Sequence, residues 1–129
     1  MNLAELYPTL AQHFDLDLFK QSLNHLDAIA HQIAGLDAQI AQVEAQGMVE
    51  ATPYYRKEKY LYLIHPQRNG ERVREYIGAD EEKQQEALRR VANWDRYSEL
   101  QQERQKIQQH LNSLLSDLRY PLHRIVRWS

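Results

Sequence analysis

The sequence predicts a mainly α-helical (α+β) fold: a long antiparallel two-helix coiled coil with a β-hairpin inserted between the helices. Apolar residues recur at alternating spacings of three and four in two long stretches, which is a heptad pattern. The stretch between them alternates with a period of two around Asn69-Gly70. Of the eight Gly and Pro residues, five lie from Gly47 to Gly78, so turns concentrate there. The length of 129 residues predicts a single domain, 1–129.

The first elements are a short helix within residues 1–16 and a long helix over 17–47. Leu3, Leu6, Leu10 and Phe14 recur at helical spacing, interrupted by Pro8, and we expect this piece to fold back and cover the bundle. Asp15 or Asp17 suits the N-cap of the long helix, and Gly47 suits the position after its end. The long helix carries a seam, prolonged toward its start by Phe19 and Leu23, of Leu26, Ile29, Ile33, Leu36, Ile40 and Val43. Gly35 within this helix favours either a close approach of another helix or a solvent-exposed position.

Residues 53–78 have the composition of strands. Asn69-Gly70 predicts a tight hairpin turn, Pro66 ends the strand before it, and residues 54–57 suit a third, edge strand. We expect one sheet face to pack on the helices through Leu61, Leu63, Val73 and Ile77. The other face then shows Tyr60, Tyr62, Arg72, Arg74 and Tyr76.

A second long helix is predicted over 80–118, followed by a basic tail at 119–129. Asp80 suits its N-cap, and Pro121 is expected to end it. Its seam comprises Leu88, Val91, Trp94, Leu100, Ile107, Leu111, Leu114 and Leu118, with Arg104 at one seam position. In the tail we expect Leu122, Ile125, Val126 and Trp128 to cover the end of the bundle, because an isolated exposed Trp is costly. One seam per helix buries little surface, so the sequence also predicts a homodimer formed through the seams.

Several function classes find no support in the residues. The chain has no Cys, which excludes disulfides and thiolate chemistry, and its six His residues form no metal-ligand pair, so no metal and no cofactor are expected. No P-loop, dinucleotide-binding or nucleophile-elbow motif occurs, so we expect neither an enzyme nor a small-molecule substrate. No apolar run or leader pattern predicts a membrane association, and a cytoplasmic location is expected.

The charge is distributed unevenly along the chain. The net charge is −2, but residues 1–53 carry −6, residues 54–77 carry +3 and residues 119–129 carry +3. Basic side chains contact phosphates and Tyr rings stack on bases, so the hairpin is a candidate binding surface. Its candidate residues are Arg56, Lys57, Lys59, Tyr60, Tyr62, Arg68, Arg72, Arg74 and Tyr76. The same residue types also occur on exposed sheets because they pack across strands, which is the alternative interpretation.

Residues 54–100 carry a pattern in which Tyr60-Leu61-Tyr62 precedes Asn69-Gly70-Glu71, then Arg74-Glu75-Tyr76-Ile77-Gly78, then a helix from Asp80. This pattern resembles that of uncharacterised small bacterial and archaeal proteins associated with mobile elements. It is also similar to the β-hairpin modules with which tyrosine recombinases bind DNA arm sites, although no recombinase domain is present. The resemblance implies a mobile-element context and nucleic-acid contact, and it implies no catalytic residue.

The sequence therefore predicts a non-catalytic binding protein, a nucleic-acid-binding accessory factor of a mobile element acting through the basic, Tyr-rich hairpin. The alternative is a protein–protein interaction module, a coiled-coil adaptor or inhibitor of a partner protein, with no role on nucleic acid. Its long helix–hairpin–helix plan is the feature that favours this alternative.

Overall fold

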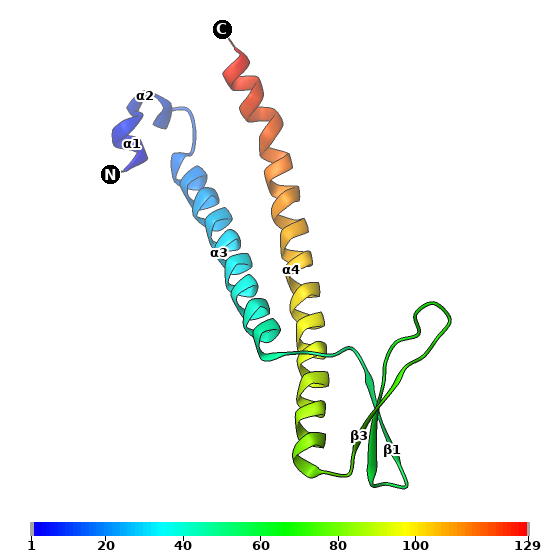
Figure 1. The fold of residues 1–129 in the computed structure, drawn as a ribbon. Coiled ribbons are helices and arrows are strands. Elements are labelled where there is room, and N and C mark those ends of the chain that lie inside the picture. Colours follow the sequence, from blue (N-terminus) through cyan, green and yellow to red (C-terminus); the bar gives the residue numbers. More distant parts are fainter. Residues whose placement is uncertain (1, 129) are drawn as a thin grey trace. The chain divides into compact units, whose positions relative to one another are not determined.

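The computed structural model describes residues 2–128; Met1 and Ser129, the outer ends of segments 1–16 and 119–129, lie outside the described residues. The elements follow in the order α1 (Leu3–Leu6), α2 (Pro8–Ala11), α3 (Leu16–Gln46), β1 (Thr52–Arg56), β2 (Tyr60–Ile64), β3 (Arg74–Gly78) and α4 (Glu81–Arg127) (Figure 1). A mainly helical chain with strands between two long helices is thereby confirmed. None of the described helices has both the length and the apolar composition needed to cross a membrane.

The chain divides into two compact units. The sheet unit comprises residues 36–103, and the terminal unit comprises the residues up to Gly35 together with those from Arg104 onward. Both long helices contribute residues to each unit.

The predicted helix caps are confirmed. The Asp15 carboxylate accepts a hydrogen bond from the Leu18 amide (2.9 Å), and the Asp80 carboxylate accepts one from the Lys83 amide (3.0 Å). Each bond satisfies an amide that has no partner in the first turn of the helix. Gly47 ends α3 with φ of +89°, a conformation that costs a residue with a Cβ about 1–2 kcal/mol.

The strands form one antiparallel sheet in the order β1-β2-β3, so the predicted edge strand is confirmed. Asn69 and Gly70 both have positive φ and lie between Arg68 and Glu71, whose backbones form an isolated bridge, as expected for the predicted turn. The second strand ends at Ile64, before Pro66. The third begins at Arg74 rather than Arg72, because residues 65–73 form a long loop.

The core of the sheet unit lies between the sheet and the first turns of α4. Leu61 and Leu63 are completely buried against Ala87 and Val91, and their alternation with half-buried neighbours follows the pleat of β2. Ile77 packs against this cluster as predicted, but Val73 does not. Val73 is 60% exposed because it lies in the loop, where no pleat turns it inward.

Gln84 holds the sheet on α4 from the other direction. Its Nε2 donates to the carbonyl oxygens of Lys59 (2.9 Å) and Gly78 (2.7 Å). Lys59 directly precedes β2, and Gly78 is the last residue of β3. The linker before the sheet crosses α4 (Figure 1), and there the Val49 amide donates to the Arg90 carbonyl (3.1 Å). Asn93 Nδ2 donates to the Gly47 carbonyl (2.8 Å), so the chain entering the sheet is fixed to the same helix.

The predicted end of the second long helix at 118 is wrong, since α4 continues through Pro121 to Arg127. Proline removes one backbone hydrogen bond and strains the preceding turn, but the following residues keep their own bonds. Arg124 and Arg127 lie in the last turn, where their positive charges interact favourably with the negative end of the helix dipole and stabilise the helix. The predicted basic tail is thus mostly the end of a helix.

Two expectations about covering the bundle end are also wrong. The N-terminal segment forms two four-residue helices, because Pro8 starts α2, and neither buries a side chain. Phe14 is 52% exposed and Trp128 is 87% exposed, since no other described segment covers them.

The α3 seam is buried as predicted from Ile29 to Val43, although Leu23 is half exposed. In the sheet unit, Arg96 on α4 donates a hydrogen bond to Gln39 on α3 (3.3 Å). A Cβ on Gly35 meets no atom within 4 Å, which agrees with the exposed interpretation of that glycine. The pairing of the two helices as a coiled coil stays a prediction.

Candidate nucleic-acid interface

A row of three tyrosines crosses the outer face of the sheet, the face turned away from α4. Tyr62 on β2 is paired with Tyr54 on β1 and with Tyr76 on β3. Directly paired residues of antiparallel strands point to the same face, so the three side chains lie side by side. The rings of Tyr62 and Tyr76 are 5.1 Å apart between centroids and tilted by 55°. Tyr54 and Tyr76 are 51% and 59% exposed, so the row is open to a ligand.

Basic side chains lie beside the row, on the side nearest the β1–β2 turn. Arg56 is paired with Tyr60, and Lys59 Nζ lies 5.6 Å from the centroid of the Tyr60 ring. A hollow of about 360 Å³ opens here on the outer face. It is lined by Arg56, Lys57, Tyr60, Tyr62 and Tyr76.

The β1–β2 turn has an unusual backbone. Lys57 and Glu58 have φ of +56° and +58°, in a turn that contains no glycine. The left-handed conformation costs each of them about 1–2 kcal/mol. Positive φ at both central residues is the geometry of a tight hairpin turn, which the hydrogen bond from the Lys59 amide to the Arg56 carbonyl (3.2 Å) closes.

The acid of β3 lies on the inner face, so the strand residues of the outer face include cations and no carboxylate. Glu75 is paired with the buried Leu63 and therefore lies on the inner face, where its carboxylate is 3.2 Å from His65 Nε2. Arg74 is paired with Ile64 at the opposite end of the outer face from Arg56. Within residues 2–128, Arg56, Lys57, Lys59 and Arg74 form no ion pair.

The basic surface has a clear boundary beside Tyr76. The hollow on the α4 side of this ring is lined by Asp80, Glu82 and Glu86, together with Lys83 and Arg90. The carboxylates belong to the first turns of α4, where the helix dipole favours negative charge. The two surfaces on either side of Tyr76 therefore differ in charge.

The predicted site residues fall into two groups. Seven of the nine lie on the outer face or beside it in the β1–β2 turn. Arg68 and Arg72 lie instead in the loop 65–73, where Arg68 Nη2 is 3.7 Å from a carboxylate oxygen of Glu50. Arg72 lines a hollow with Trp94 and Asp95 at the end of the sheet.

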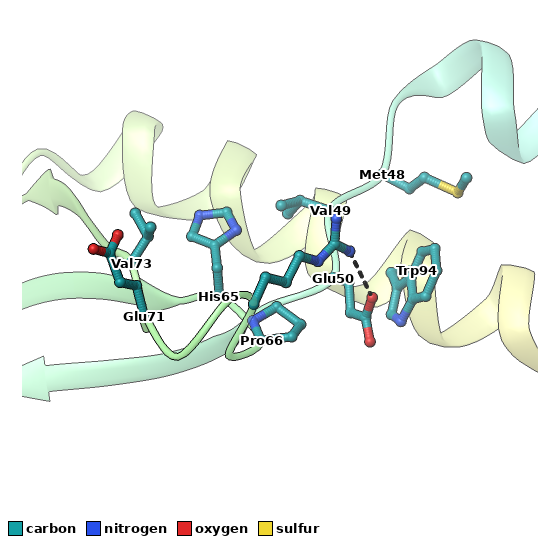
Figure 2. Close-up of a pocket in the computed structure, with 9 residues that line it drawn as sticks. Met48, Val49, Glu50, His65, Pro66, Glu71, Val73 and Trp94 are labelled. Atoms are coloured by element: carbon teal, nitrogen blue, oxygen red, sulfur yellow. Dashed lines mark ion pairs between the residues drawn. The ribbon is translucent and has the colours of Figure 1, made fainter.

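The loop forms a second hollow, of about 520 Å³, together with the linker and α4. Figure 2 shows Glu50 beside Trp94, with its ion pair to Arg68 drawn as a dashed line, and Pro66 and His65 on the loop side. This ion pair joins one basic and one acidic group, which on their own would favour ligands of opposite charge. Among residues 2–128, no group of three or more His, Asp or Glu side chains is placed to hold a metal ion.

Sequence reasoning did not include Tyr54 in the site. Its place in the row depends on the pairing of β1 with β2, which no pattern in the sequence specifies to the residue. The usable signal was the alternation of Thr52, Tyr54 and Arg56, which predicts a common face for the three side chains.

In comparisons with protein-family models, curated proteins and solved structures, no match to this chain was found. The resemblance of residues 54–100 to mobile-element-associated proteins stays a prediction.

Proposed function

We propose that this protein is a non-catalytic nucleic-acid-binding factor that uses the outer face of its three-stranded sheet. The observation that carries the proposal is a row of three tyrosines, exposed at both ends, flanked by cations that form no ion pair within residues 2–128, on a face from which Glu75 of β3 is turned inward. Cations that form no ion pair with a described carboxylate are available to phosphates, whose neutralisation releases counterions and favours binding.

The support beneath this face suits a binding role. The sheet is fixed to α4 by the buried Leu61 and Leu63 and by the two hydrogen bonds of Gln84. The side chains of the outer face are thus presented on a prepositioned scaffold, which lowers the entropy lost on binding. A role as an accessory factor of a mobile element, and a cytoplasmic location, are parts of the same proposal and rest on the sequence.

Fluorescence anisotropy with a labelled oligonucleotide tests the proposal. In Arg56→Ala plus Arg74→Ala, we expect about a tenfold or larger loss of affinity at low salt, and a salt-dependence slope smaller by about 2. Arg89→Ala plus Arg96→Ala is the matched control, because it removes the same charge from exposed positions of α4 outside the sheet. Absence of binding by the natural protein at about 50 mM salt, or an equal loss in the control, would overturn the proposal.

We also propose a second, independent contact, in which the terminal unit binds a second copy of the chain. Its α4 end exposes Ile125 by 69%, Val126 by 83% and Trp128 by 87%, more than a monomer ordinarily leaves on adjacent large apolar side chains. Residues 1–35 hold four acids and one base, whereas residues 104–129 hold five bases and one acid. A two-fold axis places the acidic segment of one copy on the basic segment of the other. Pairing of α3 with α4 as an antiparallel coiled coil belongs to this proposal.

Sedimentation equilibrium tests the second contact. We expect a dimer for the natural protein and a monomer with unchanged helix content for Ile125→Ser plus Val126→Ser. Val73→Ser is the control, because Val73 is 60% exposed but lies in the sheet unit. A natural protein that is monomeric at tens of micromolar would contradict the contact, whatever its affinity for nucleic acid.

A further inference from the structure

We infer that the ligand of the outer face is single-stranded nucleic acid, whose bases stack on the row formed by Tyr54, Tyr62 and Tyr76. The inference rests on the proposed function, because it names the form of nucleic acid that the same face binds. It is carried by the chemistry at the centre of the face, which is aromatic and uncharged, and by the position of the cations, which are at its ends.

The row suits stacking because Tyr54 and Tyr76, at its two ends, are more than half exposed, with the half-buried Tyr62 between them. Neighbouring strands are about 4.8 Å apart, so three paired tyrosines span about 10 Å across the sheet. Tyr62 contacts Tyr76 in a tilted arrangement, which supports the ring of Tyr76 while leaving 59% of the residue exposed. A base in a single strand offers both of its faces to such a ring, whereas a base in a duplex is already covered by its neighbours.

The centre of the face does not suit reading of a duplex. Sequence is read in the major groove mainly by Arg, Lys, Asn and Gln side chains that reach base edges. No residue of these types lies in the row itself, and Arg56 and Arg74 lie on either side of it. Cations placed there meet the backbone of a strand that runs along the row.

The hollow beside Tyr60 gives the strand a defined place to enter. Its volume of about 360 Å³ lies within the range of small-ligand pockets, about 300–1,000 Å³. Tyr62 and Tyr76 form its aromatic wall, and Arg56 and Lys57 form its basic wall. One nucleotide suits both walls at once, with its base on the aromatic wall and its phosphate on the basic wall. The positive φ of Lys57 sets the direction of the chain at that residue of the turn.

The test compares a labelled 20-nucleotide single strand with the duplex of the same sequence. We expect the single strand to bind at least about tenfold more tightly. Tyr76→Leu is expected to weaken single-strand binding by about five- to a hundredfold, as removal of one stacking ring does. Tyr76→Phe retains the ring and is expected to retain affinity, and Tyr120→Leu, 74% exposed in the terminal unit, is the matched control. The salt dependence is expected to stay unchanged in all three, because no cation is removed.

A second measurement uses the natural protein alone. With 2-aminopurine in the oligonucleotide, stacking on a tyrosine changes the emission on binding, so a Leu variant that fails to fold does not prevent a decision. Duplex binding as tight as single-strand binding, together with an unaffected Tyr76→Leu variant, overturns the inference while the proposed function stands. If neither form of nucleic acid binds, both fail.

Discussion

Gln84 shows how a single side chain sets the position of the candidate interface. Its amide nitrogen donates to two backbone carbonyls, that of Lys59, directly before β2, and that of Gly78, the last residue of β3. The Gly78 carbonyl lies in a part-buried position, where a carbonyl that lacks a partner loses free energy. One amide therefore holds both strands against the first turn of α4.

We expect Gln84→Ala to lower the free energy of unfolding by about 1–3 kcal/mol, because two carbonyls lose their donor. Urea denaturation followed by circular dichroism measures this. Gln85→Ala is the matched control, since Gln85 is exposed on the same turn and makes only a 3.5 Å contact with Glu81; its change is expected within about 0.5 kcal/mol. Equal effects of the two substitutions would show that the amide does not hold the strands.

The boundary beside the basic face contains an ion pair with a predictable titration. Arg89 donates to both carboxylate oxygens of Glu86, at 2.6 and 3.0 Å, and these hydrogen bonds hold the pKa of Glu86 below its ordinary value of 4.5. The carboxylate is the form that the pair favours. Its contribution is therefore present above the ordinary pKa and is lost as the pH falls through the lowered pKa.

In a carbon-13 NMR titration, we expect Arg89→Gln to raise the midpoint of the Glu86 carboxyl toward 4.5. Arg96→Gln removes the same charge from α4 without touching this pair, and is expected to leave the midpoint where it is. A midpoint that does not move in Arg89→Gln contradicts the assignment of the shift to these hydrogen bonds.

At the scale of elements, the packing of β2 on α4 decides which sheet face is free. Leu61 and Leu63 fill the space above Ala87 and Val91, so Tyr60, Tyr62 and Ile64 must point outward. A register shift by one residue would bury the tyrosines and expose the leucines. The core therefore fixes the orientation of the candidate interface as well as the stability of the sheet.

We expect Leu63→Ala to cost about 2–5 kcal/mol of unfolding free energy, because it leaves a cavity at a completely buried position. Val73→Ala is expected to change it by less than about 0.5 kcal/mol, since Val73 is 60% exposed in the loop. Denaturation midpoints in urea distinguish the two. A large effect of Val73→Ala would mean that the loop packs more closely than its exposure indicates.

At the scale of the whole molecule, the two units differ in how completely they bury their apolar residues. The sheet unit encloses a small core, whereas the terminal unit leaves large apolar side chains exposed on α1, α2 and the end of α4. Small domains that bury little surface depend on association for stability. The terminal unit is thus where association with a second copy would bury the most exposed apolar surface.

Substitution of Ile33, a buried residue of the α3 seam, tests the packing of the terminal unit. We expect Ile33→Asp to cost about 3 kcal/mol or more, because it introduces a charge without a partner at a position that is 7% exposed. Gln32→Asp introduces the same charge at the adjacent exposed position and is expected to have little effect. Thermal melting by circular dichroism and sedimentation velocity check both, and an unchanged melt for Ile33→Asp would contradict burial of the seam.

Local chemistry accounts for what was predicted correctly. The caps at Asp15 and Asp80, the turn at Asn69-Gly70 and the α3 seam follow from residues within a few positions of one another. The end of α4 was missed because a proline weakens a helix without forbidding it, and the environment of Trp128 was missed because a helix end needs a second segment to cover it.

Two capped helices, the Tyr-rich basic hairpin between them and the uneven charge follow from the sequence, because periodicity, capping and turn chemistry are local. The tertiary structure was needed to show that Tyr54 joins Tyr62 and Tyr76, that Glu75 meets His65, and that Arg68 pairs with Glu50. Strand register and long-range packing bring together residues that are distant in the chain, and neither is encoded in the spacing of neighbours.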